Sequence, residues 1–161
     1  MIPMNHGLDL DPIAAQAVRD VLATGFKSHP IPVLPDEIPE DSGDASWLTS
    51  LVNLEGTEAC GIVHLEISES LLDRLNESLG DCSRDPSTRE NDLADLAGEL
   101  CNMIAGRIAS GLAASRLRFT LSTPVVLRER RTEAEGGAGQ RRSRSGWTVG
   151  DGALILTIRI P

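Results

Sequence analysis

One stretch of the chain carries two side chains whose types and spacing could support chemistry. Glu99 and Asn102 are three residues apart, which on a helix places them one turn apart on the same face. A side-chain amide both accepts and donates hydrogen bonds, so it can orient a water molecule, and a carboxylate can pair with a cation. The same pair occurs on many solvated helices, so the spacing alone leaves a purely structural interpretation open.

The sequence around this pair predicts the longest helix of the chain. Ser87 followed by Glu90 has the form of a capping box, which predicts that the helix begins near residue 88. Apolar residues then recur at helical spacing as one stripe that faces a core. The stripe consists of Leu93, Leu96, Ala97, Leu100, Ile104, Ile108 and Leu112.

The opposite side of this helix combines polar and very small residues. Gly costs about 1 kcal/mol relative to Ala inside a helix, so glycines here need a compensating reason. Close approach of a partner surface is one reason, and packing against a neighbouring element of the same chain is another. At about 100° per residue, this side holds Asp92, Asp95, Glu99, Asn102 and Gly106, with Gly98, Ala105 and Ala109 beside Asn102.

Length, charge and composition restrict the function classes. The chain has 161 residues, which suits a single domain over residues 1–161 with one core. Its formal net charge of -9 argues against nucleic acid or an anionic membrane as the main partner. There is no apolar run of 18 residues, and the first residues do not resemble a signal peptide. We therefore expect a soluble cytoplasmic protein.

Candidate metal ligands and nucleophiles are scattered along the chain. Cys60, Cys82 and Cys101 form no C-x-x-C pair, so reduced thiols are expected. Cys101 turns toward the edge of the apolar stripe, which predicts a small buried residue and not a nucleophile. The histidines lack metal-ligand spacing, and no glycine-rich phosphate loop is present. We expect no metal and no cofactor of the protein's own.

The remaining elements predict helices packed on a sheet. Residues 11–25 predict an amphipathic helix with Asp11 as its N-cap, and prolines make residues 30–45 an extended connector. A hairpin is predicted over residues 47–54 and 60–67, with His64 on its more polar side. A second helix is predicted over residues 68–80, and its apolar stripe includes Leu79. Residues 119–127 predict an edge strand limited by Pro124, and residues 147–160 a closing strand.

An arginine-rich segment lies between these last two strands. Its glycine-rich centre predicts a flexible loop over residues 128–146. A solvated insertion and an electrostatic contact with an acidic partner are both open interpretations. The arginines are Arg128, Arg130, Arg131, Arg141, Arg142 and Arg144.

A weak internal repeat supports the fold class. Residues 55–67 and 148–160 share a turn, a small residue and an alternating apolar run, at an offset of 93 positions. A helix-strand-strand unit used twice predicts an α+β domain, with helices packed on a mostly antiparallel sheet.

The string GELCNMIAGRIASGL closely resembles the active-site helix of the CheX/CheC/FliY family of chemotaxis phosphatases. Members of that family carry a Glu-x-x-Asn pair, here Glu99 and Asn102. Leu100, Met103, Ala105 and Gly106 match the surrounding family pattern as well. The family is similarly built from two helix-strand-strand units. Two-site members carry a second pair in their first helix, whereas DPIAAQAVRDVLATG has none. The chain therefore resembles the single-site, CheX-type members.

The resemblance implies a phosphatase that hydrolyses the phospho-aspartate of a CheY-like response regulator in chemotaxis or two-component signalling. Glu99 and Asn102 would be catalytic, and Asp95, Gly98, Met103 and Gly106 would contact the receiver domain. The partner would supply the Mg²⁺, and a homodimer is a candidate assembly. The rival hypothesis is a non-catalytic adaptor module that binds a response regulator through the same helix.

Overall fold

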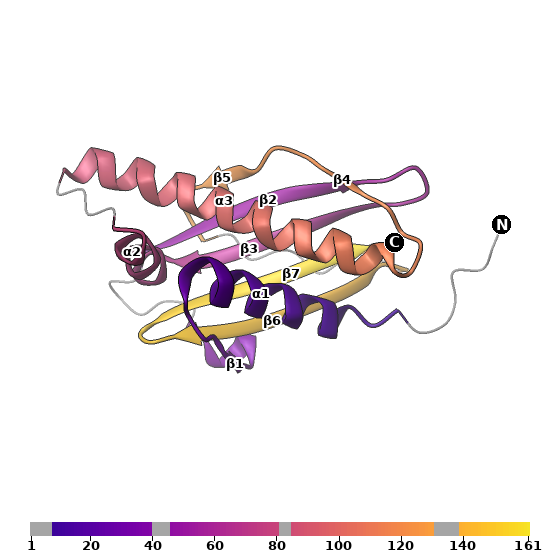
Figure 1. Ribbon diagram of the computed structural model, residues 1–161, viewed down its shortest axis with the longest axis horizontal. Coiled ribbons are helices and arrows are strands. Elements are labelled where there is room, and N and C mark those ends of the chain that lie inside the picture. Colours follow the sequence, from indigo (N-terminus) through magenta and orange to yellow (C-terminus); the bar gives the residue numbers. More distant parts are fainter. Residues whose placement is uncertain (1–7, 40–45, 81–84, 131–138) are drawn as a thin grey trace.

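A computed structural model describes residues 8–39, 46–80, 85–130 and 139–161. In these ranges three α-helices lie on one face of a seven-stranded sheet (Figure 1). All strand pairs are antiparallel, which confirms the predicted α+β fold. The helices are α1 (Leu10–Phe26), α2 (Glu69–Ser78) and α3 (Pro86–Ala113), with a 3-10 turn, η1, at Pro35–Glu37. The strands are β1 (Ile31–Val33), β2 (Trp47–Glu55), β3 (Cys60–Ser68), β4 (Thr120–Leu121), β5 (Val125–Leu127), β6 (Arg141–Val149) and β7 (Gly152–Ile160).

The core lies between the sheet and the helices. The strands are ordered β1-β6-β7-β3-β2-β4, and β5 also pairs with β2. Alternation along β3 sends Val63, Leu65 and Ile67 toward the helices, where all three are fully buried. All residues of the apolar stripe predicted on α3 are buried in the same core, so that prediction is confirmed. The stripe fixes which side of α3 is left outside.

The N-terminus of α3 differs from the prediction. The helix begins at Pro86, and Asp85 is its N-cap: Asp85 Oδ2 accepts hydrogen bonds from Thr88 N at 3.1 Å and from Ser87 Oγ at 2.7 Å. The capping box proposed at Ser87 was wrong because this aspartate, two residues earlier, accepts from the helix's free N–H groups. Proline also suits the first helical position.

The other two helices show smaller departures. α1 begins at Leu10 with Asp9 as its N-cap, so the assignment of Asp11 as cap was wrong by two residues. α2 is capped by Ser68 as predicted, but it ends at Ser78. Leu79 is therefore beyond the helix and 56% exposed, and its place in the buried stripe was also wrong.

Residues 141–160 form a hairpin and not one closing strand. β6 and β7 pair along their whole length, and Gly150 at φ 60° allows the tight turn between them. The expectation of a flexible loop up to residue 146 was wrong for its described end, because β6 starts at Arg141. Alternating arginine and serine conceals this strand, since neither residue signals an apolar face. Residues 131–138, including Arg131, lie outside the described residues.

The proline-rich connector contributes an edge strand. Ile31 and Val33 of β1 lie opposite Thr148 and Gly146 of β6. The extended conformation was predicted, but its pairing with the sheet was not. The part of the connector over residues 40–45 lies outside the described residues.

An approximate two-fold relation runs through the centre of the sheet. The hairpin β2–β3 and the hairpin β6–β7 have the same register at the 93-residue offset: Glu55 faces Cys60, and Thr148 faces Ala153. The offset maps His64 onto Thr157, and these two residues face each other where β3 pairs with β7. The two hairpins are therefore joined symmetrically at their second strands.

The sheet face away from the helices carries a buried ionic group. Glu66 is fully buried, and its Oε1 accepts a hydrogen bond from Arg130 Nε at 2.9 Å. The Arg130 guanidinium lies 4.3 Å from the centre of the Trp47 ring, and Arg144 Nη2 lies 3.8 Å from Glu66 Oε2. His64, predicted on the more polar side, is buried on this face at 3% exposure. Arg144 thus lies in β6 and Arg130 packs on the sheet, so neither belongs to a solvated insertion.

Candidate functional site

The Glu99 and Asn102 side chains lie on the outer side of α3. Leu100 and Cys101, between them in sequence, are fully buried, so the helix period turns Glu99 and Asn102 away from the core. Glu99 is exposed and Asn102 is half-buried. Within the described residues neither side chain forms a hydrogen bond or an ion pair. Both groups are available to a partner.

Two glycines on α3 flank Asn102, each one helical turn away. A Cβ built at Gly98 would lie 3.3 Å from Val126 Cγ2 and 3.6 Å from Pro124 Cβ. Packing against the β5 edge therefore accounts for the small residue at Gly98, which is buried. Its role in partner contact stays a prediction.

Gly106 is in a different environment. A Cβ there would meet only Leu121 Cδ1, at 3.9 Å, which is an ordinary contact distance. Gly106 is half-buried, and no side chain projects from the outer surface of α3 at this position. A small residue here keeps space open beside Asn102.

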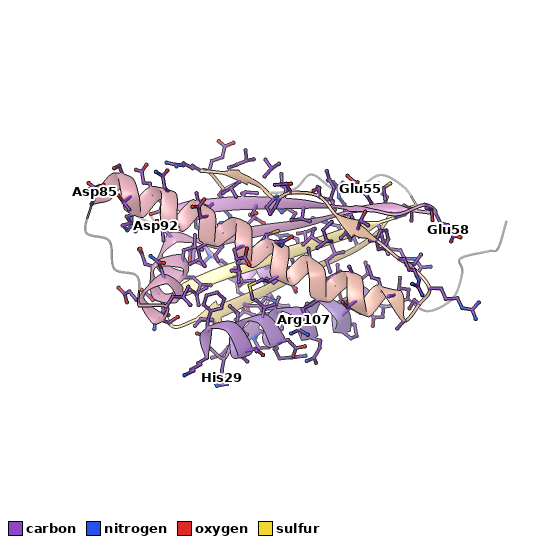
Figure 2. All side chains as sticks on the ribbon, turned by 45° about the horizontal axis from the view of Figure 1, so that its top comes forward. His29, Glu55, Glu58, Asp85, Asp92 and Arg107 are labelled. Carbon is purple, nitrogen blue, oxygen red and sulfur yellow. The ribbon has the colours of Figure 1, made fainter. Side chains whose placement is uncertain are left out.

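A groove between α1 and α3 adjoins this face. It has a volume of about 400 Å³, and Met103 and Gly106 contribute to its wall from α3. Thr24 and Gly25 line it from α1, and Figure 2 shows Arg107 on the side of α3 that faces α1. The sequence placed Met103 and Gly106 near the site but gave no sign of the contribution from α1, because contacts between the two helices are set by packing.

Acidic side chains line the first half of the outer face. Asp95 is exposed and Asp92 is half-buried, and Figure 2 shows Asp92 between the start of α3 at Asp85 and the position of Arg107. Hydrogen bonds from Ser87 and Thr88 lower the pKa of Asp85. Asp92 and Asp95 thus place two carboxyl groups on the face that leads to Glu99.

Cys101 is not a nucleophile in this setting. Burial raises the pKa of its thiol to about 12, and Sγ donates a hydrogen bond to Ser50 O at 3.6 Å. A protonated thiol is a poor nucleophile. The prediction of a small buried residue is confirmed.

The described residues contain no metal-binding cluster. No group of three or more His, Cys, Asp or Glu side chains among them is arranged to hold a metal ion. None of their helices is both long enough and apolar enough to cross a membrane.

Comparisons with known proteins agree with the fold. CheX from Vibrio vulnificus matches with a TM-score of 0.77 and 18% identity, over 98% of this chain and 99% of that one. CheX from Desulfovibrio desulfuricans matches with a TM-score of 0.73 and 19% identity, over 94% and 99%. The complex of CheX with CheY, BeF3 and Mg²⁺ from Borrelia burgdorferi matches with a TM-score of 0.72 and 17% identity, over 96% and 99%.

The sequence itself identifies the family. No curated protein matches the chain. The family model described as "Chemotaxis phosphatase CheX" matches residues 48–142, which is more than half of the chain and includes α3 with Glu99 and Asn102. The chain therefore belongs to the CheX family of chemotaxis phosphatases.

Proposed function

We propose that the protein accelerates hydrolysis of the phospho-aspartate on a CheY-like receiver domain. The observation that carries this proposal is the free carboxylate and the free amide, one turn apart on the outer face of α3. The fold supports it, since the similar CheX from Borrelia burgdorferi forms a complex with CheY, BeF3 and Mg²⁺. The phosphoryl group and the metal would both arrive with the partner.

Asn102 acts on the attacking water in this mechanism. An acyl phosphate is already reactive, so a catalyst has mainly to place water in line with the bond that breaks. The amide of Asn102 can accept a hydrogen bond from that water, and its half-buried position limits the directions in which the amide can point. Amides position water in the same way in GTPases.

Glu99 has a docking role. Its exposed carboxylate pairs with the cationic lysine of the receiver's active site and so fixes the distance between Asn102 and the phosphoryl group. A charge pair across an interface sets register and orientation. Because Glu99 has no partner among the described residues, no internal ion pair has to be broken when it docks.

The contact surface extends on both sides of this pair. Asp95 precedes Glu99 by one turn, and Met103 and Gly106 lead into the groove shared with Thr24 and Gly25 of α1. An apolar side chain of the receiver can enter this groove while the phosphoryl group faces Asn102. Gly98 contributes indirectly, by allowing the β5 edge to pack against α3.

Phosphate release from a phosphorylated receiver, with and without this protein, tests the proposal. Asn102→Ala should abolish the acceleration while the melting temperature stays within a few degrees of wild type, because the position is on the outside of a helix. Asn76→Ala on α2 is the matched control and should keep full activity. Saturable binding without any acceleration by the wild-type protein would overturn the proposal in favour of a non-catalytic adaptor.

We also propose a cytoplasmic location. Free thiols at Cys60 and Cys101 are consistent with the reducing cytoplasm, where disulfides are rare. A homodimer stays a prediction, and sedimentation of the purified protein would test it.

A further inference from the structure

The edge of the sheet next to α3 contains an extra residue. Ser122 N donates to Asn53 O at 3.0 Å, and Asn53 N donates to Ser122 Oγ at 2.9 Å. Leu51 faces Val125 where β5 pairs with β2. The two residues between Ser122 and Val125 therefore both lie opposite Val52. Two residues opposite one is a β-bulge, a feature that re-aims side chains and is common beside active sites.

The bulge turns both Thr123 and Pro124 toward the helices. Leu121, two residues before Thr123, lies on the helix side and packs against the core. Val126, two residues after Pro124, also lies on that side, against Gly98 of α3. Side chains two residues apart on a strand point to the same face. Thr123 therefore points to the helix side like Leu121, and Pro124 points to the helix side like Val126.

Contacts of this edge with Gly98 and Gly106 set the position of Thr123 along the axis of α3. Pro124 lies against Gly98, one turn before Asn102, and the end of β4 lies against Gly106, one turn after it. Thr123 lies between these two contacts in the chain. It is therefore level with Asn102.

The hydroxyl of Thr123 is available, unlike that of its neighbour. Ser122 Oγ accepts from Asn53 N and donates to Thr123 O at 3.2 Å, so it is used in holding the edge. Thr123 is exposed, and its hydroxyl forms no hydrogen bond with any described residue. Pro124 restricts the Thr123 backbone to extended conformations, which limits where this hydroxyl can be.

We propose that Thr123 is a further catalytic residue, which holds the attacking water together with Asn102. The inference rests on the proposed function. Asn102 Oδ1 accepts one O–H of the water, and Thr123 Oγ1 accepts the other. With both O–H bonds fixed, a lone pair on the water oxygen is directed at phosphorus.

The reaction needs no further participant beyond the receiver and its metal. The water oxygen forms a bond to phosphorus as the bond between phosphorus and the aspartate oxygen breaks. The electron pair of that bond stays on the aspartate carboxylate, and both protons of the water leave with the released phosphate.

A pair of substitutions at this position tests the inference. Thr123→Val keeps the shape but removes the hydroxyl, and it should lower the rate at saturating phosphorylated receiver by roughly five- to tenfold. The receiver concentration at half-maximal rate and the melting temperature should stay at the wild-type values. Thr123→Ser should restore most of the rate. The matched control is Thr120→Val, which removes a hydroxyl that donates to Glu55 O at 3.2 Å on the same edge, and it should leave the rate unchanged.

The two side chains should not contribute equally. Thr123→Val should leave a reduced but measurable acceleration, whereas Asn102→Ala should leave none. A wild-type rate for Thr123→Val, alongside an active wild-type protein and an inactive Asn102→Ala, would overturn this inference alone. No acceleration by the wild-type protein would instead overturn the proposed function.

Discussion

Arg130 and Glu66, 64 positions apart in the sequence, form an ion pair of 2.9 Å on the sheet face away from the helices. The Glu66 side chain is fully buried, and that of Arg130 is 12% exposed. The Trp47 ring covers the guanidinium. This pair ties the chain that leaves β5 to the middle of the sheet.

Removing the Arg130 side chain should leave the buried Glu66 carboxylate without its main ion-pair partner. We predict that Arg130→Met lowers the free energy of unfolding by about 3 kcal/mol, the low end for breaking a buried pair, because Arg144 remains near Glu66. Urea denaturation measures this change. Arg128→Met is the control, since the pair of Arg128 with Glu90 is more than half exposed and should contribute less than about 1 kcal/mol.

Coupling between the two residues provides a second test. The double variant Arg130→Met with Glu66→Leu should be more stable than Arg130→Met alone, because it leaves no buried charge without its partner. A double variant that is less stable than either single variant would contradict the ion-pair explanation.

The two glycines beside Asn102 should respond in opposite ways. Gly106→Leu should leave the protein as stable as wild type or more so, because helix propensity rises by up to about 1 kcal/mol, and it should block receiver binding. Gly98→Leu should cost about 1–3 kcal/mol through overpacking against Pro124 and Val126. Thermal unfolding and a receiver-binding titration together distinguish the two. Intact binding by Gly106→Leu would show that the receiver docks elsewhere.

Glu99 should affect binding as well as rate. Glu99→Ala removes a docking charge, so the receiver concentration at half-maximal rate should rise and the saturated rate should fall. The wild-type protein should lose affinity as salt increases, and the variant should show a weaker salt dependence. Glu77→Ala, an exposed change on α2, serves as the control. An unchanged half-maximal concentration for Glu99→Ala would remove the docking role.

The buried thiol of Cys101 should make the free energy of unfolding depend on pH in the alkaline range. Burial raises the pKa of this thiol to about 12, from an ordinary value of 9.0, so folding favours the protonated form. That contribution to stability is fully present below pH 9 and is lost between about pH 9 and 12, as the unfolded state releases its proton. In a Cys82→Ser background, iodoacetamide at pH 8 should alkylate the exposed Cys60 and leave Cys101 unmodified. Modification of both thiols in the folded protein would contradict this.

Local signals explain what could be predicted of the fold. The apolar stripe from Leu93 to Leu112 repeats with the helix period, so the buried side of α3 follows from the sequence. The N-cap of α3 does not follow from the sequence, because Ser87 and Asp85 are both acceptable caps. The choice depends on whether the helix begins at Pro86 or after it. Periodicity identifies faces better than it identifies ends.

Non-local contacts explain what could not be predicted. β6 is encoded by alternating arginine and serine, and its assignment as a strand depends on pairing with β7. The bulge at Thr123 exists only relative to β2, so the residues from Phe119 to Leu127 read as a single interrupted strand. Glu99 and Asn102 were found because a family pattern marks them, whereas no pattern marked Thr24 or Gly25 of α1.

The pairing of His64 with Thr157 also bears on the origin of this domain. A contact in which a position meets its own equivalent is the geometry of a symmetric dimer interface, here contained in one chain. Such a contact is expected if a gene for one helix and one hairpin was duplicated and the two copies were fused after their products had already associated as a pair. Fusion would then allow the copies to diverge. The second copy's helix carries Glu99 and Asn102, while the first copy's helix, free of that demand, now supplies a wall of the groove beside them.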